Sequence, residues 1–279
     1  MPRLTFAVAL ATLLAMDPLN DIASTGKVAA AGYDRPTGDP RQSRSVVLAK
    51  HGMVATSHPA AAQAGLDVLK GGGNAVDAAI AANAMLGVVE PMSCGIGGDV
   101  FVIYWDNETR KLYGLNGSGR SPGTLNRKVF PDQGLKSIPT EGPLSWSVPG
   151  CVDGWAVLHE RFGKTKFADL FAPAIAAADE GFPVAEIIAG YWRGAEAALL
   201  RHEHSAATYL VDGRAPRFGE IFKNPRLAET YRKIASGGRD AFYEGDIAEQ
   251  IVAFSEKHGG DFTMKDFTDH QTTRIDPVS

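Results

Sequence analysis

One arginine in this sequence is placed where its side chain could bind a carboxylate. Arg120 follows Asn-Gly-Ser-Gly at residues 116–119, directly after an apolar stretch typical of a strand. A guanidinium in a loop at a strand end can hold a carboxylate through two parallel hydrogen bonds. Arg120 could equally be a solvent-exposed arginine or part of a structural ion pair, and residue type alone favours that second interpretation.

The two cysteines, Cys94 and Cys151, are the next residues that could carry chemistry. Cysteine catalysis needs a base and a lowered thiol pKa, and nothing near Cys94 in the sequence favours either. Two cysteines cannot build a disulfide framework, and their spacing is not that of zinc ligands. They could bridge each other or both stay reduced. We predict free, buried thiols.

Three further motifs have structural explanations. The glycines at residues 95–98 lack the Gly-Lys-Ser/Thr ending of a phosphate loop, so nucleotide binding is not expected. His202-Glu203-His204 places its histidines two residues apart, which do not face one another on a helix, so we interpret it as a polar helix end and expect no metal. Thr272-Thr273 is interpreted as a polar stretch that enters a strand.

Helices and one hairpin must position these residues. Apolar residues recur at helical spacing in seven segments, most of them ended by glycine: 60–70, 75–89, 152–162, 167–180, 185–200, 225–235 and 246–258. The hairpin is predicted at 101–105 and 111–115, joined by Asp-Asn-Glu-Thr. The helix at 75–89 is apolar on all sides and should be interior, with Asn74 as its cap and Asp77 in its first turn.

The composition is that of an ordinary globular protein. Its 279 residues carry a net charge of −4, with acidic and basic residues interspersed, so neither nucleic acid nor an anionic membrane is an expected partner. Residues 1–45 are predicted to be a leader and linker, and 46–279 the folded part. A basic residue before an apolar run at 4–16 predicts a signal peptide, and hence a periplasmic or secreted protein. The alternative is a disordered tail on a cytoplasmic protein.

Several segments, in order from residue 46 onward, resemble the gamma-glutamyltransferase family. The most specific is Gly-Gly-Asn-Ala-Val-Asp-Ala-Ala at 72–79. The others are 52–55, 64–70, 87–91, 147–150, 170–174, 180–182 and 242–245.

This resemblance implies an α/β fold, the αββα sandwich of the N-terminal-nucleophile hydrolases, made as a precursor that cuts itself into two chains. The cut frees a threonine whose own amine activates its hydroxyl. That threonine attacks a γ-glutamyl amide such as glutathione, and the acyl group passes to water or an amine. No cofactor is implied.

The match covers the family's N-terminal, large-subunit portion, so we expect this chain to end before the nucleophile. No catalytic residue is therefore assigned within it. Half a two-sheet sandwich should expose apolar surface, and the chain alone should be inactive and poorly soluble.

The carboxylate-binding loop also departs from the family pattern, Asp-Gly-Arg-Glu-x-Ala-Pro. Aligned without gaps, Ser118 stands at the arginine's place and Arg120 lies two residues later. We take Arg120 and Ser118 as the candidate substrate-binding residues of a divergent branch. Two alternatives stay open: a related acylase acting on glutaryl or β-lactam-type amides, and a non-catalytic binding domain or relic.

Overall fold

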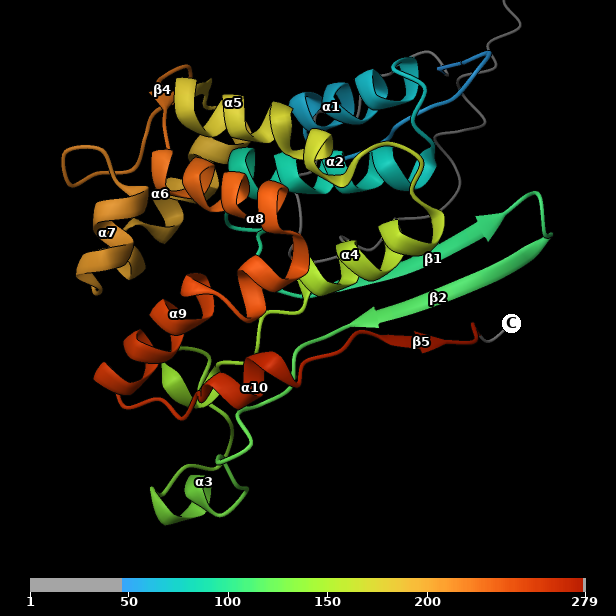
Figure 1. Cartoon of the computed structure of the whole chain (residues 1–279). Coiled ribbons are helices and arrows are strands. Elements are labelled where there is room, and N and C mark those ends of the chain that lie inside the picture. Colours follow the sequence, from blue (N-terminus) through green and yellow to red (C-terminus); the bar gives the residue numbers. More distant parts are fainter. Residues whose placement is uncertain (1–46, 278–279) are drawn as a thin grey trace, which may run out of the picture. The chain divides into compact units, whose positions relative to one another are not determined.

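Helices cover one side of a small antiparallel sheet in the computed structural model, which describes residues 47–277 (Figure 1). The α-helices are α1 (Pro59–Lys70), α2 (Ala75–Val89), α3 (Val129–Asp132), α4 (Cys151–Phe162), α5 (Ala172–Glu180), α6 (Glu186–Leu199), α7 (Glu203–Tyr209), α8 (Pro225–Tyr243), α9 (Asp246–Lys257) and α10 (Met264–Thr268). Two 3-10 helices, η1 (Pro143–Ser145) and η2 (Phe167–Phe171), complete the helical part. No helix within the described residues is long and apolar enough to cross a membrane.

Helix α2 is the centre of the core, as its all-round apolar sequence predicts. Eleven of its fifteen residues are buried, and it packs against α1, α4 and α5. From α8, the buried Tyr231 donates a hydrogen bond to the Ala84 carbonyl of α2 at 2.9 Å, which satisfies its hydroxyl inside the core.

The cap of α2 also fixes α4. The Asn74 side chain accepts from the second and third amides of α2, and the fully buried Asp77 accepts from the Asn74 amide at 2.9 Å, a reciprocal capping box. Asp77 accepts in addition from the backbone amides of Lys164 and Thr165, at 3.1 and 3.2 Å, in the turn that follows α4. A cap predicted as local therefore also joins two helices.

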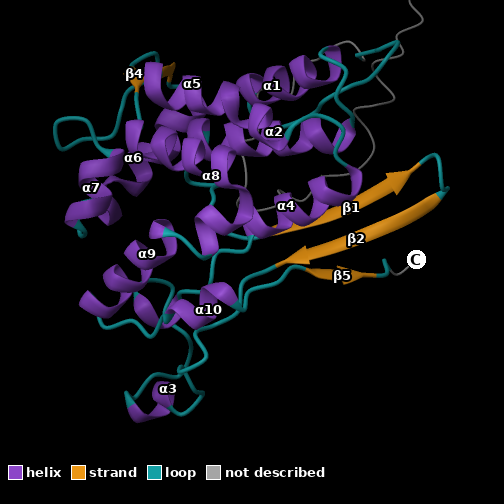
Figure 2. Ribbon diagram, in the orientation of Figure 1, coloured by secondary structure: helices purple, strands orange, loops and turns teal. Residues whose placement is uncertain are grey.

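The sheet has the strand order β1-β2-β5 and is antiparallel throughout (Figure 2). β1 (Val100–Asp106) and β2 (Lys111–Gly117) form the predicted hairpin, and β5 (Thr273–Ile275) pairs with β2, so Thr272-Thr273 does enter a strand. A separate pair joins β3 (Phe182–Pro183) to β4 (Ile221–Phe222).

The two faces of the main sheet differ. Side chains of β1 alternate, and the inner set packs towards α4, whereas the outer set is left in solvent. Opposite residues of an antiparallel pair share a face, so β2 and β5 add to the outer set. Its large members are 45–74% exposed: Phe101, Ile103, Trp105, Leu112 and Ile275. This is the exposed apolar surface that the sequence analysis expected.

Three helical predictions were wrong in detail. The segment 167–180 divides into η2 and α5, and the predicted helix 225–235 continues as α8 to Tyr243. Gly238 kinks α8 with φ of +63° instead of ending it, because the chain resumes a helical path afterwards. His202-Glu203-His204 lies at the start of α7 and not at the end of the preceding helix: α6 stops at Leu199, and His202 is the N-cap residue of α7, with no capping hydrogen bond from its side chain.

Candidate functional site

An aspartate binds the backbone and a side chain of the loop that follows β2. Asp99 lies just before β1, and its carboxylate accepts the Gly119 amide at 2.8 Å and the Ser118 hydroxyl at 3.2 Å. The Asn116 side chain accepts the Ser118 amide at 2.9 Å, which closes a tight turn. Three hydrogen bonds thus fix the backbone immediately before Arg120.

The other side of this loop rests on the segment that leads into α4. Val148 donates its amide to the Arg120 carbonyl at 2.9 Å. A Cβ atom on Gly119 would lie 1.6 Å from the Val148 carbonyl oxygen, so only glycine allows the two chains to approach this closely. Gly150 meets Gly117 in the same way, at 2.0 Å. The glycines of this loop therefore form a close backbone contact.

The side chain of Arg120 is exposed and makes no hydrogen bond or ion pair with any residue in 47–277. It lines a hollow of about 540 Å³, together with residues from the loop, α10 and the approach to β5. The polar members of this lining include Asp266, Asp269 and His270. Ser118 is not among the lining residues, since its hydroxyl turns towards Asp99. The structure thus places the two candidate residues in one loop, with different surroundings.

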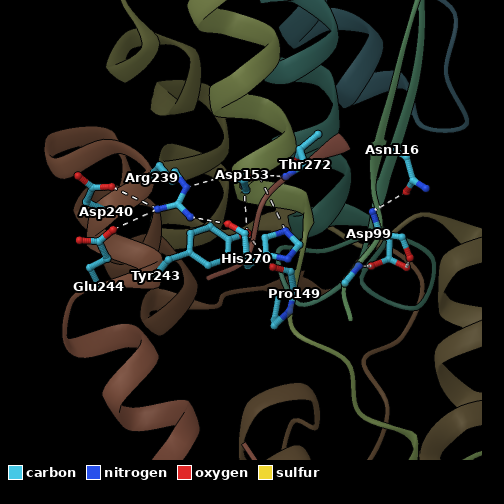
Figure 3. A network of polar contacts seen from close by, with 12 residues as sticks. Asp99, Asn116, Pro149, Asp153, Arg239, Asp240, Tyr243, Glu244, His270 and Thr272 are labelled. Atoms are coloured by element: carbon cyan, nitrogen blue, oxygen red, sulfur yellow. Dashed lines mark hydrogen bonds and ion pairs between the residues drawn. The ribbon is translucent and has the colours of Figure 1, made fainter. Parts of the chain in front are cut away.

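Beneath this hollow lies a buried ion pair that ties three elements together (Figure 3). Asp153, in the first turn of α4, is 2% exposed, and its carboxylate accepts from Arg239 Nε at 2.5 Å and from the Thr272 amide at 2.6 Å. Arg239, beyond the kink of α8, also donates to the His270 carbonyl at 2.7 Å. The pair therefore holds the chain that enters β5 against α4 and α8.

Tyr243 and His270 pack beside this ion pair. The Tyr243 hydroxyl donates to the Pro149 carbonyl at 2.6 Å and accepts the Asp153 amide at 3.0 Å, and the two rings stack with centroids 5.4 Å apart. Burial lowers the pKa of His270, which the nearby Asp153 carboxylate only partly offsets. His270 is 4% exposed, and its Nε2 has no hydrogen-bond partner among the described residues. Burial therefore favours the neutral form of the ring.

The thiols do not resemble nucleophiles. Both cysteines are free, as predicted, although Cys94 is only half-buried. Burial raises the pKa of Cys94, and Glu90 adds to the rise, whereas a catalytic thiol needs the opposite shift. Burial likewise raises the pKa of Cys151. Both thiols line a second hollow, of about 400 Å³, beside the glycine turn at residues 95–98.

The other motifs remain outside this region. His204 packs on Phe254 of α9, with ring centroids 5.4 Å apart. Within residues 47–277 no group of three or more His, Cys, Asp or Glu side chains could hold a metal. Thr273 is the first residue of β5 and pairs with Asn116 at one end of the ladder between β2 and β5.

Sequence reasoning missed the residues around Asp153. Tyr243 stood in the family-like segment 242–245 and Thr272 in the Thr-Thr pair, but neither was linked to Asp153. Its partners Arg239, Tyr243, His270 and Thr272 come from distant segments, and only the fold brings them together. Asp99 was not among the residues singled out from the sequence. Its position one residue before a strand, facing the end of the paired strand, was the available signal.

This chain is similar to known proteins in both sequence and structure. A sequence model of the family Gamma-glutamyltranspeptidase matches residues 61–279. A glutathione hydrolase-like proenzyme of Bacillus subtilis is 38% identical over 237 residues, which is 85% of this chain and 45% of that protein.

Two solved structures are similar over most of the described residues. A cephalosporin acylase from Bacillus halodurans is 42% identical with a TM-score of 0.81, over 88% of this chain and 47% of that one. A gamma-glutamyltranspeptidase from Helicobacter pylori is 29% identical with a TM-score of 0.80, over 84% and 68%. The chain spans less than half the length of the Bacillus proteins it matches.

Proposed function

This chain belongs to the gamma-glutamyltranspeptidase family, and we propose that it is the large-subunit portion of an amidohydrolase acting on γ-glutamyl amides such as glutathione. The fold class predicted from the sequence, the αββα sandwich of N-terminal-nucleophile hydrolases, is confirmed by the structural likeness to the Helicobacter pylori enzyme. In the complete protein a threonine of the small-subunit portion would attack the amide carbon, and water or an amine would then take the acyl group.

The observation that carries this proposal is the state of Arg120. Its guanidinium is exposed, borders a hollow and has no carboxylate partner among residues 47–277, although the loop backbone around it is firmly held. A structural arginine would normally pair with a carboxylate, whereas a substrate-binding one must be left unpaired until the ligand arrives. We therefore assign Arg120 to the substrate's α-carboxylate. Ser118 would act indirectly, because its hydroxyl donates a hydrogen bond to the Asp99 carboxylate and so orients it.

The small-subunit portion is the proposed partner of the outer sheet face. A sandwich needs a second layer over its sheet. Among the described residues, the uncovered surface that suits such a layer is the outer set of apolar side chains on β1, β2 and β5. We propose that this chain alone is inactive.

Export through the apolar run at 4–16 stays a proposal too, since that segment lies outside the described residues. Sequencing the N-terminus of the mature protein would test it.

The assay uses the complete protein with anilides of different acyl groups. Lysine cannot reproduce the two parallel hydrogen bonds of a guanidinium, so Arg120→Lys should raise KM for γ-glutamyl anilide by about tenfold. Arg226→Lys, an exposed arginine at the start of α8, is the matched control. No hydrolysis of γ-glutamyl anilide by the unaltered protein would overturn the function. Unchanged kinetics for Arg120→Lys would remove only this residue from the site.

The second candidate is an acylase for other amides, which the 42% identity to a cephalosporin acylase favours. Glutaryl anilide separates the two, because it keeps the terminal carboxylate of the γ-glutamyl group and lacks its ammonium. A lower KM for glutaryl than for γ-glutamyl anilide would favour this candidate.

A further inference from the structure

A hollow of about 510 Å³ lies between α6 and the segment that leads into β4. It shares no lining residue with the hollow of Arg120, and α6 and β4 lie on the far side of the fold from β1, β2 and β5 (Figure 1). Five charged residues line it: Glu186, Arg193, Glu196, Arg214 and Arg217. Its volume falls within the range of about 300–1,000 Å³ that is typical of small-molecule sites.

One wall of this hollow is a single face of α6. The lining residues of the helix follow one another at intervals of three, four and three positions, which places them on one side: Glu186, Ala189, Arg193 and Glu196. Ala189 is small and buried, so it leaves room between the longer charged side chains around it.

The opposite wall is a loop whose backbone is fixed by two glutamates. The Arg214 guanidinium donates two hydrogen bonds to the Glu220 carboxylate, at 2.8 and 2.9 Å, and Glu220 also accepts the Arg217 amide at 2.8 Å. These hydrogen bonds, above all those from the Arg214 side chain, lower the pKa of Glu220 to about 2, so the pair stays charged. Glu196 accepts the Ala215 amide at 2.8 Å, which attaches the loop to α6. Arg214 and Glu196 therefore already have partners inside the protein.

Two arginines of the hollow have no such partner. The side chains of Arg193 and Arg217 are exposed and form no hydrogen bond or ion pair with another part of the described chain. The remaining carboxylate, Glu186, lies at the start of α6, about 10 Å along the helix axis from Arg193, where the helix dipole favours a negative charge. Phe218, next to Arg217 in the chain, is 69% exposed. Near Arg193 the hollow therefore offers a ligand two guanidinium groups and one aromatic ring.

We propose that this hollow is a second binding site, which takes a small organic anion with its carboxylate or phosphate on Arg193 and Arg217 and its apolar part against Phe218. Two guanidinium groups favour an oxyanion, since each can donate two parallel hydrogen bonds to it. An inorganic anion would leave the aromatic ring and the buried alanines of the two walls without a contact. The loop is fixed before the ligand arrives, so little backbone freedom is lost on binding.

Four probes test the site in the complete protein. Phenylacetate carries a carboxylate and an apolar ring, phenyl phosphate replaces the carboxylate with a phosphate, acetate lacks the ring, and phenylacetamide lacks the charge. An NMR titration followed at the amides of Ala215 and Phe218 gives the Kd at this hollow. The better of the two aromatic anions should bind at least about tenfold more tightly than acetate or phenylacetamide, and it identifies the preferred anion.

Arg193→Gln and Arg217→Gln remove one charge each and should each raise that Kd by about tenfold. Arg226→Gln is the matched control, because Arg226 is an exposed arginine outside the hollow, and it should leave the Kd unchanged. An unchanged midpoint of urea unfolding shows that each variant is folded.

Three results would overturn the proposal: no binding of either aromatic anion, equal binding of all four probes, or shifts confined to the loop of Arg120. None of them bears on hydrolysis of γ-glutamyl anilide, so the second site and the proposed function can fail independently.

Discussion

Removing the charge of Asp153 should destabilise this fold more than removing any comparable surface charge. Asparagine at this position keeps the shape of the side chain but turns one oxygen into an NH2 group. That group must then face either Arg239 Nε or the Thr272 amide, both of which are donors at 2.5 and 2.6 Å. One hydrogen bond becomes a donor–donor contact, and the other loses its charge.

The magnitude follows from the burial of the two partners. Breaking a fully buried ion pair costs about 3–5 kcal/mol, because the remaining charge is left without water or a partner. Arg239 is 23% exposed at its side chain and can regain some hydration, which brings the cost to the bottom of this range or just below it. We expect Asp153→Asn to lower the free energy of unfolding by about 2–3 kcal/mol.

Urea-induced unfolding at low protein concentration measures this loss. Asp179→Asn is the control: Asp179 pairs with Arg232 at 2.6 Å, but both side chains are about half exposed, so less than about 1 kcal/mol should be lost. Amide exchange at Thr272 should also accelerate in Asp153→Asn alone. A change below about 0.5 kcal/mol in Asp153→Asn would refute the view that this pair anchors β5.

Three other predictions concern the same regions. Gly119→Ala should lower the free energy of unfolding in urea by about 3 kcal/mol, because the added methyl group would overlap a backbone carbonyl. Gly95→Ala is the control, since its methyl group would enter open space and should cost little. Equal effects of the two substitutions would contradict this prediction. Burial lowers the pKa of His270 from its ordinary 6.5, so the unfolded chain binds the proton more readily than the folded chain. The free energy of unfolding should therefore be highest above pH 6.5 and should fall as the pH drops below 6.5. A His270→Asn variant with the same pH profile as the unaltered protein would contradict this. Ile103→Thr, on the outer sheet face, should reduce binding of a hydrophobic dye such as ANS by this chain, and an undiminished signal would place the exposed surface elsewhere.

Sequence reasoning recovered the features that local rules determine. Asn74 and Asp77 cap α2 as expected, and the hairpin of β1 and β2 falls within two residues of its predicted bounds, because caps and turns depend on neighbours along the chain. Gly238 shows the limit of such rules. A glycine at a positive φ can end a helix or kink it, and the packing of the following residues decides which.

The candidate site was predicted in part. Arg120 was identified from its residue type and its place after a strand. The ion pair of Asp153 and Arg239 was not, since 86 residues separate its partners and no sequence pattern links them. Asp99 was not singled out either, since only the fold shows that its carboxylate binds Ser118 and Gly119 of the loop after β2.

The most direct test of the central claim is to trap the acyl-enzyme of the complete protein. After rapid acid quenching of a reaction with γ-glutamyl anilide, mass spectrometry of the separated subunits should find one γ-glutamyl group on the N-terminal threonine of the small subunit, and none on residues 1–279. An adduct on this chain instead, for example at Cys94, would contradict the account and make a residue that we consider structural the nucleophile.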